Sequence, residues 1–142
     1  MANTTVDVGT GATLTLATSL LVVNWTSMAL GTKSIDVIDT THLGTTGNKT
    51  IMGGDLTNPG EVTLEFQWDS ENGPGVSNVS ELLTVTFPRL NPPNTVSAAT
   101  YAGTGILTSI TYPTLGVEEL QTGSLTFTFD GQATDATYTD AV

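Results

Sequence analysis

The 142-residue sequence contains no cysteine and only three basic residues, Lys33, Lys49 and Arg89. Without cysteine the chain can form no disulfide, and it has no thiolate to hold zinc or an iron–sulfur cluster or to act as a nucleophile. Lysine and arginine supply most of the affinity of conventional nucleic-acid-binding proteins by neutralising phosphates. A formal net charge of -11 therefore argues against that class, and the length suits a single domain with its own core.

Residues typical of helix surfaces are also scarce, with 6 Glu, 2 Lys and 1 Arg against 29 Thr and 15 Gly. Threonine is β-branched and is disfavoured in helices, whereas it packs well on the pleated surface of a strand. With 38% hydrophobic residues, including two Trp, four Phe and three Tyr, the chain has enough apolar side chains to fold. The composition therefore predicts an ordered β protein.

An uncharged stretch over residues 8–32 is the one candidate for a membrane segment. Threonine, serine and asparagine interrupt it repeatedly, and these polar groups would be poorly placed in hydrocarbon, so we interpret it as two strands. The first eleven residues lack the basic region and apolar core of a signal peptide. We therefore expect synthesis inside the cell without export, and no membrane association.

Alternation of apolar and polar residues predicts most of the strands. The clearest case is residues 61–69, where every second residue from Val62 to Trp68 is apolar and the residues between are acidic or polar. The strands expected from this pattern lie around residues 13–16, 22–30, 34–39, 61–69, 83–87, 96–101, 105–112 and 123–129.

Between these strands, residues 43–59 contain four glycines, Asn58 and Pro59, and we expect them to form a long loop. Residues 114–120 are the one segment expected to form a helical turn. The sequence thus predicts an all-β fold, an antiparallel β-sandwich or barrel of about seven to eight strands with one short helix and a long inter-strand loop. We expect a flexible N-terminal arm (residues 1–11), a β-sandwich domain (12–131) and a C-terminal tail (132–142).

No catalytic, cofactor-binding or metal-binding constellation is evident in the sequence. His42 is the sole histidine and no Gly-x-Ser-x-Gly elbow accompanies it, so we expect a structural histidine whose ring nitrogen bonds a nearby carboxylate or carbonyl. Glu61 and Glu65 would be about 13 Å apart along a strand, too far for paired-carboxylate glycoside hydrolysis. Trp25 and Trp68 are expected to be core aromatics, with a sugar-stacking platform as the alternative if they are exposed.

The middle of the chain resembles a known family. Residues 34–47 (SIDVIDTTHLGTTG), followed by Asn58-Pro59-Gly60 and the alternating strand from Glu61, resemble the major tail tube proteins of bacteriophages with long non-contractile tails. Residues 83–88 and a late strand ending near Asp130 are similar in type and order. The resemblance covers roughly residues 14–131.

This resemblance implies a non-enzymatic virion protein without a cofactor, assembled in the host bacterial cytoplasm into the phage tail. Subunits of the family form hexameric rings whose strands join into a continuous inner barrel, and the rings stack into a tube through which viral DNA is ejected without specific binding. The implied partners are other copies of the chain, the tape measure protein, the tail terminator and distal tail proteins. The arm, the tail or the loop at residues 43–59 would bridge neighbouring rings.

An acidic channel would repel the phosphate backbone, so DNA could slide through it without sticking. Asp36, Glu61 and Glu65 are the candidates for lining such a lumen, and the alternative is that these acids simply face the outer solvent. The candidates for contacts between rings or subunits lie in the expected loop: Leu43, Gly44, Thr45, Thr46, Gly47, Asn48, Lys49, Thr50, Met52 and Asp55.

Two other classes of function stay open at this point. One is a different structural part of a virion with a similar fold, such as a tail terminator, a distal-tail ring or a capsid decoration protein. The other is a carbohydrate-binding β-sandwich, which needs Trp25 or Trp68 exposed in a groove. Closed rings, indefinite tubes or a glycan-binding monomer would distinguish these possibilities.

Overall fold

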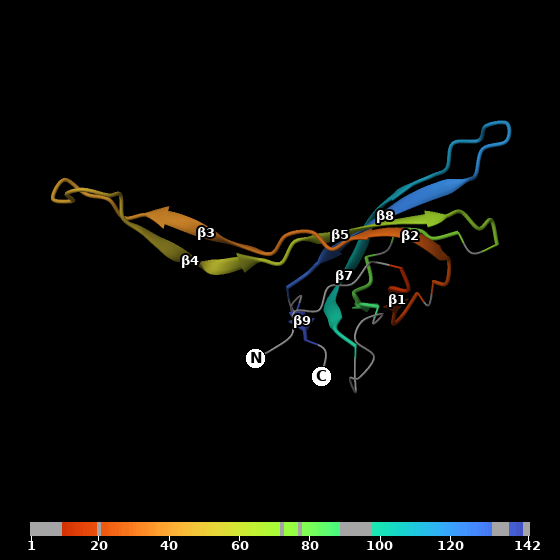
Figure 1. Cartoon of the computed structure of the whole chain (residues 1–142), viewed down its shortest axis with the longest axis horizontal. Helices are drawn as coiled ribbons and strands as arrows, with labels where there is room; N and C mark the ends of the chain where they lie inside the picture. Colours follow the sequence, from red (N-terminus) through yellow and green to blue (C-terminus); the bar gives the residue numbers. More distant parts are fainter. Residues whose placement is uncertain are drawn as a thin grey trace.

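The computed structural model describes residues 10–19, 21–71, 73–76, 78–88, 98–131 and 137–140, and the predicted all-β class is confirmed (Figure 1). No helix occurs in these residues. The nine strands are β1 (Thr13–Leu16), β2 (Asn24–Ala29), β3 (Ser34–Asp39), β4 (Ile51–Asn58), β5 (Glu61–Gln67), β6 (Glu81–Thr86), β7 (Thr100–Thr111), β8 (Thr122–Phe129) and β9 (Thr137–Thr139).

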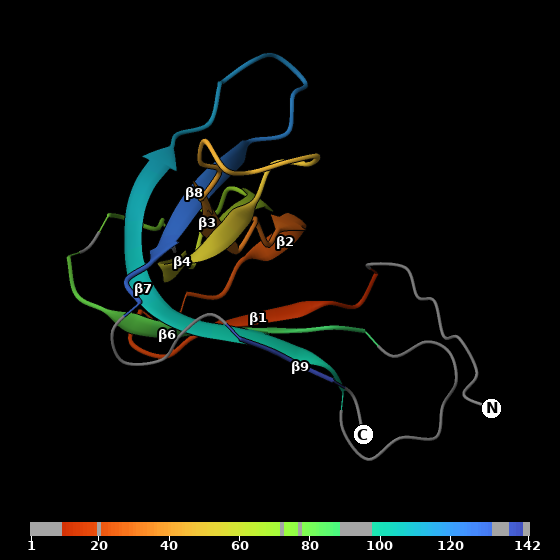
Figure 2. The ribbon, with the colours of Figure 1, turned by 90° about the vertical axis from the view of Figure 1, so that its left-hand side faces the viewer.

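Seven of these strands form one antiparallel sheet, in the order β1-β6-β7-β8-β5-β2, with β9 paired to β7 beyond the end of β8. β7 is the longest strand, and it pairs with β6 through its first half and with β8 through its second half. Figure 2 shows that β7 curves strongly, so that the sheet curls into a half-barrel. β3 and β4 form a separate two-stranded sheet.

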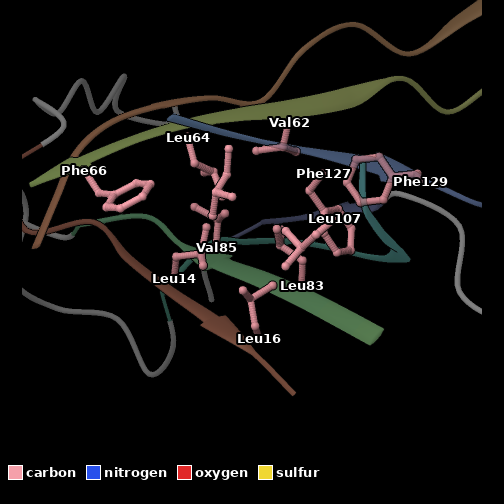
Figure 3. Close-up of a cluster of buried hydrophobic side chains, with 11 residues drawn as sticks. Leu14, Leu16, Val62, Leu64, Phe66, Leu83, Val85, Leu107, Phe127 and Phe129 are labelled. Atoms are coloured by element: carbon pink, nitrogen blue, oxygen red, sulfur yellow. The ribbon is translucent and has the colours of Figure 1, made fainter. Parts of the chain in front are cut away.

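The core lies inside this curl, where side chains from β1 and β6 meet those from β5 and β8 (Figure 3). The predicted alternation sets this arrangement: Val62, Leu64 and Phe66 are fully buried on β5, and the residues between them are exposed. On β8, Leu125 and Phe127 face the same interior, directly opposite Leu64 and Val62 in the strand register. Burying these side chains supplies the main favourable free energy of folding.

β7 differs from the prediction, which placed two strands at residues 96–101 and 105–112. The structure has one continuous strand with a register irregularity between Leu107 and Ser109, while residues 96 and 97 lie outside the described part. A Cβ at Gly105 would lie 2.1 Å from the Thr128 carbonyl oxygen. Glycine therefore allows close packing within a bent strand, where the sequence suggested a break.

The helical turn expected at residues 114–120 is wrong. These residues form an irregular connection in which Glu118 has a φ of 58° and the Glu119 N–H donates to the Gly116 carbonyl over 3.4 Å. Gly116 and the β-branched residues Thr114 and Val117 within the segment disfavour a helix.

Only parts of the two expected terminal segments lie within the described residues. Part of the expected C-terminal tail is ordered as β9, whose Tyr138 ring packs edge-on against Phe87 with 5.5 Å between ring centroids. Most of the expected N-terminal arm, residues 1–9, lies outside the described residues. No helix in the part of the chain that the structure describes is long and apolar enough to cross a membrane.

The long loop expected over residues 43–59 is also wrong in its second half, because Ile51–Asn58 form β4 and pair with β3. Two of the four glycines that suggested a loop, Gly53 and Gly54, lie at an irregularity in this pairing, where the register jumps between Ile35 and Val37. A Cβ at Gly54 would come within 3.2 Å of the Asp36 carbonyl oxygen. Glycine is thus accommodated in a hairpin whose partner strand supplies the backbone hydrogen bonds.

Candidate functional site

The β3–β4 hairpin, residues 33–58, projects from the half-barrel as a separate arm (Figure 1). Two glycines allow it to leave the sheet. Gly31, just before the hairpin, and Gly60, just after it, have φ values of 76° and 84°, which other residues rarely adopt. A Cβ on Gly31 would lie 2.0 Å from the Glu61 carbonyl oxygen, and a Cβ on Gly60 would lie 2.3 Å from the Thr32 carbonyl oxygen. The two connections therefore pass each other in direct backbone contact, and we call this point the glycine crossing.

The hairpin carries apolar side chains that the rest of the described chain does not cover. Val37 is 63% exposed and Leu56 is 82% exposed. The large exposed hydrophobic residues of the hairpin are Ile35, Val37, Ile38, Leu43, Ile51, Met52 and Leu56. An isolated two-stranded hairpin is marginally stable in water, so these side chains form an apolar surface suited to contact with another molecule.

The tip of the hairpin, residues 40–50, is organised by short-range hydrogen bonds. The Thr45 N–H donates to the His42 carbonyl over 2.8 Å, and the His42 N–H donates to Thr45 Oγ1 over 3.0 Å. Nδ1 of His42 accepts from the Gly44 N–H over 3.1 Å. The ring thus accepts from a backbone donor and not from the expected carboxylate or carbonyl, because the tight turn brings the amide of Gly44 to the ring.

Asp39 ends β3 beside this tip and is fixed by Thr41. The Thr41 hydroxyl, and after it the Thr41 backbone amide, stabilise the carboxylate by hydrogen bonding and hold the pKa of Asp39 below its ordinary value. The amide donates to Asp39 Oδ1 over 2.9 Å. The Thr50 N–H in turn donates to Thr41 Oγ1 over 3.1 Å, which connects the two sides of the tip.

All ten residues proposed from the sequence for contacts between subunits lie in the hairpin. Eight of them are in the tip, whereas Met52 and Asp55 lie on β4. Leu43 is fully exposed and Lys49 is also exposed. The structure therefore gathers these residues on one projecting element.

The three lumen candidates are not brought together. Glu61 and Glu65 share the exposed face of β5, where their strand-register neighbours on β8 are Thr128 and Ser124. Asp36 lies on β3, in the separate hairpin sheet.

The exposed face of the seven-stranded sheet is rich in hydroxyl groups. Thr108 and Thr128 on neighbouring strands share a hydrogen bond of 3.0 Å, and Thr63 is paired with Thr126. None of the seven strands contains Lys or Arg. Together with Glu61 and Glu65, these groups make a polar, acidic sheet face that offers DNA phosphates no positive charge.

The two tryptophans pack on the core, as predicted. The Trp25 ring meets Phe66 edge-on at 5.7 Å between centroids, and the Trp68 ring stacks on Phe66 at 5.8 Å. Trp68 also lines a surface groove of about 630 Å³, together with Val22, Asp69 and Glu119. No cluster of three or more His, Cys, Asp or Glu suited to a metal ion occurs among the residues the structure describes.

This groove was not identified from the sequence. It is assembled from three segments that are far apart in the chain, at residues 22–24, 67–70 and 119–121. The connection between β7 and β8, which contributes residues 119–121 to the groove, also exposes Leu115 and Val117 strongly. The sequence offered no signal for the groove, since residues 114–120, which overlap one of its three segments, were expected to form a helical turn.

The fold is similar to that of solved structural parts of contractile injection systems. A chain of the anti-feeding prophage cap, described as a tube-terminating cap, aligns with a TM-score of 0.71 and 17% identity over 99% of this chain and 95% of that chain. A chain of the PVC sheath/tube terminator, from an extracellular contractile injection system in the extended state, aligns with a TM-score of 0.66 and 17% identity over 92% and 96% of the two chains. A chain of the PVC sheath–tube complex in the extended state aligns with a TM-score of 0.64 and 17% identity over 92% of this chain and 88% of that chain.

At this level of identity the likeness shows a shared fold, which extends over nearly the whole of the chain. No protein-family model matches the sequence. No curated protein matches it either.

Proposed function

We propose that the chain is a structural, non-enzymatic subunit that assembles with copies of itself into a ring at the tube of a phage-tail-like particle. The observation that carries this proposal is the hairpin, which exposes apolar side chains such as Val37 and Leu56 although the half-barrel has a complete core of its own. Exposure of these apolar side chains to water is unfavourable, so the surface suits a permanent contact with another subunit.

The borders of the sheet support the same role. β1 and β2 end the strand order, and among the described residues each pairs with one neighbouring strand, β6 and β5 respectively. Edges of this kind are natural sites for pairing with another chain. Because the two edges differ in sequence, a contact between them joins unlike surfaces, and a rotation that closes produces a ring. Six copies, the number implied by the family resemblance, is the ring size that we propose.

Within this role, the comparisons favour the tube terminator over the repeating tube subunit. Two of the similar structures reported above are described as tube-terminating. The repeating tube subunit is the second candidate, supported by the similarity to a chain of a sheath–tube complex. The hairpin suits both, since it can reach a neighbour in the same ring or in the next one.

Electron microscopy of the purified, concentrated protein tests the proposal. Closed rings with a central hole are expected for a terminator, and tubes of indefinite length for a repeating tube subunit. A matched variant with Val37→Thr, Ile51→Thr and Leu56→Thr should keep the circular dichroism spectrum of the parent and lose the assemblies. A monomer at every concentration, even with the other tail components added, would contradict the proposal.

The acidic sheet face is proposed to line the channel through Glu61 and Glu65. Asp36, in the separate hairpin sheet, would then line the channel only if the hairpin also reaches it. A particle carrying Glu61→Lys and Glu65→Lys should assemble but pass DNA more slowly, because the new ammonium groups would bind phosphates. Unchanged ejection kinetics would place these residues on another surface.

A further inference from the structure

The groove beside Trp68 combines apolar walls with acidic groups. Val22, which is 80% exposed, Leu120 and the Trp68 ring provide the apolar part. Asp69 and Glu119 provide the two carboxylates. A ligand that matches this groove must therefore carry an apolar side chain next to a positive charge.

The tip of the hairpin has this combination. In the sequence, Lys49 of the tip lies between Leu43, which is fully exposed, and Ile51, the first residue of β4, which is 66% exposed. The hairpin contains two of the three basic residues of the whole chain, against three aspartates. The rest of the chain holds the other 11 acidic residues with one arginine, so the hairpin is the part of this acidic protein least repelled by an acidic groove.

The tip and the groove lie at opposite ends of the molecule. Figure 1 shows the hairpin extending to one side, while the β7–β8 connection and the end of β5 lie on the other side. The eight residues of β4 alone span roughly 26 Å at the rise of a strand. A chain therefore does not bring its own tip to its own groove, but a second copy can do so.

We propose that the groove beside Trp68 receives the hairpin tip of a second copy of this chain. Lys49 then approaches Asp69 and Glu119, while Leu43 and Ile51 pack against Trp68 and Leu120. The contact joins two different surfaces, so each copy offers one tip and one groove, and the pattern repeats from copy to copy. This inference rests on the proposed self-assembly and names the two surfaces that meet.

The absence of cysteine allows a direct test by disulfide cross-linking. One preparation carries Asn48→Cys at the tip, and a second, with a different affinity tag, carries Ser70→Cys at the exposed rim of the groove. Mixed under assembly conditions and mildly oxidised, the two should form a mixed disulfide dimer. The matched control pairs Asn48→Cys with Thr63→Cys on the exposed face of β5 and should give several-fold less product.

A charge exchange tests the role of the lysine. Lys49→Glu should lower the cross-linking yield about two- to fivefold, the range expected for an exposed ion pair. Glu119→Lys in the groove-bearing partner should restore it. If Lys49→Glu cross-links as efficiently as the parent, Lys49 takes no part in the contact, and that part of the proposal is overturned.

The outcomes separate this inference from the proposed function. Rings or tubes by microscopy, with the tip cross-linking equally to groove and control or only to another tip, would overturn the inference and leave the assembly role standing. A protein that neither assembles nor cross-links would overturn both. Efficient cross-linking to the groove, reversed by the charge exchange, supports both.

Discussion

Similar apolar residues are buried in the seven-stranded sheet but exposed in the β3–β4 hairpin. Val62 and Leu64 on β5 are fully buried, whereas Val37 and Ile38 on β3 are 63% and 46% exposed. The local patterns are alike, since in both strands branched apolar residues are interleaved with acids. What differs is the second layer: the curl of the sheet brings β1 and β6 opposite β5 and β8, and no described element covers the hairpin.

The half-barrel is therefore stabilised by its own core, while the hairpin depends on its attachment or on a partner. A two-stranded ribbon gains its backbone hydrogen bonds but buries little apolar surface. In this chain it is held at its base by the glycine crossing and at its tip by the bonds among Thr40, Thr41 and Thr50. The hairpin is therefore the region where changes should affect assembly more than folding.

The largest expected effect comes from Phe66→Ala in the core. Phe66 is fully buried and contacts the rings of both Trp25 and Trp68. We expect the free energy of unfolding to fall by about 3–5 kcal/mol, as is typical for loss of a buried aromatic ring. In the hairpin, Ile51→Ala should change it by about 0.5 kcal/mol or less, as for an exposed position. Urea unfolding of the monomer measures both, and equal losses would contradict the contrast between the two regions.

The glycine crossing gives the next largest effect. Gly60 and Gly47 have nearly the same φ, 84° and 85°, but a Cβ would be 2.3 Å from a backbone oxygen at Gly60 and would meet nothing within 4 Å at Gly47. Substitution by alanine should lower the free energy of unfolding by about 1–2 kcal/mol at either position, because the backbone is in the left-handed conformation. At Gly60 we expect about 1–3 kcal/mol more from crowding.

Urea unfolding together with hydrogen exchange of the hairpin amides measures these changes, and Gly47→Ala serves as the control for conformation alone. Gly60→Ala should also loosen the hairpin relative to the sheet. If the two variants lose equal stability, backbone contact at the crossing does not constrain the hairpin.

Ser19→Ala is expected to have a smaller effect. The backbone N–H and the hydroxyl of Ser19 both donate to the carboxylate of Glu81, over 2.7 and 2.8 Å, and Glu81 is only 6% exposed. Removing the hydroxyl takes one donor from a buried acceptor, which should cost about 1.5 kcal/mol. Ser80→Ala is the matched control, because the Ser80 hydroxyl donates over 2.7 Å to Asp130 at an exposed site. Similar losses in the two variants would show that burial of Glu81 adds nothing.

The sheet was largely predictable from the sequence and the hairpin only in part. Strict alternation placed Val62, Leu64 and Phe66 in the core, and the structure confirms each of them. β4 was not predicted because Gly53 and Gly54 interrupt any alternation, and its strand conformation comes from pairing with β3. Local propensity carried no information on that pairing.

The candidate site was also only partly predictable from the sequence. The segment proposed for contacts between subunits was expected as a loop because of its glycine content, and its contact role came from the family resemblance. The structure instead shows a projecting hairpin. The groove beside Trp68 could not be predicted, because Val22, Asp69 and Glu119 come together only when the sheet curls. Placement of Asp36 away from Glu61 and Glu65 likewise depends on the glycine crossing, which no periodicity reveals.

The smallest expected effect concerns the tip of the hairpin and its pH dependence. Hydrogen bonding from Thr41 lowers the pKa of Asp39. Its contribution to stability should therefore be complete above the pKa of an unfolded aspartate, about 3.9, and be lost as pH falls through the lower pKa of the folded state. Thr41→Val should raise the pKa of Asp39 toward its ordinary value, whereas Thr41→Ser, which keeps the hydroxyl, should leave it low. Carbon-13 NMR titration of the aspartate carboxyl groups measures both, and because the hairpin is separate from the core, global unfolding should hardly respond to either change. A pKa that stays low in Thr41→Val would mean that the tip is not organised around this hydroxyl.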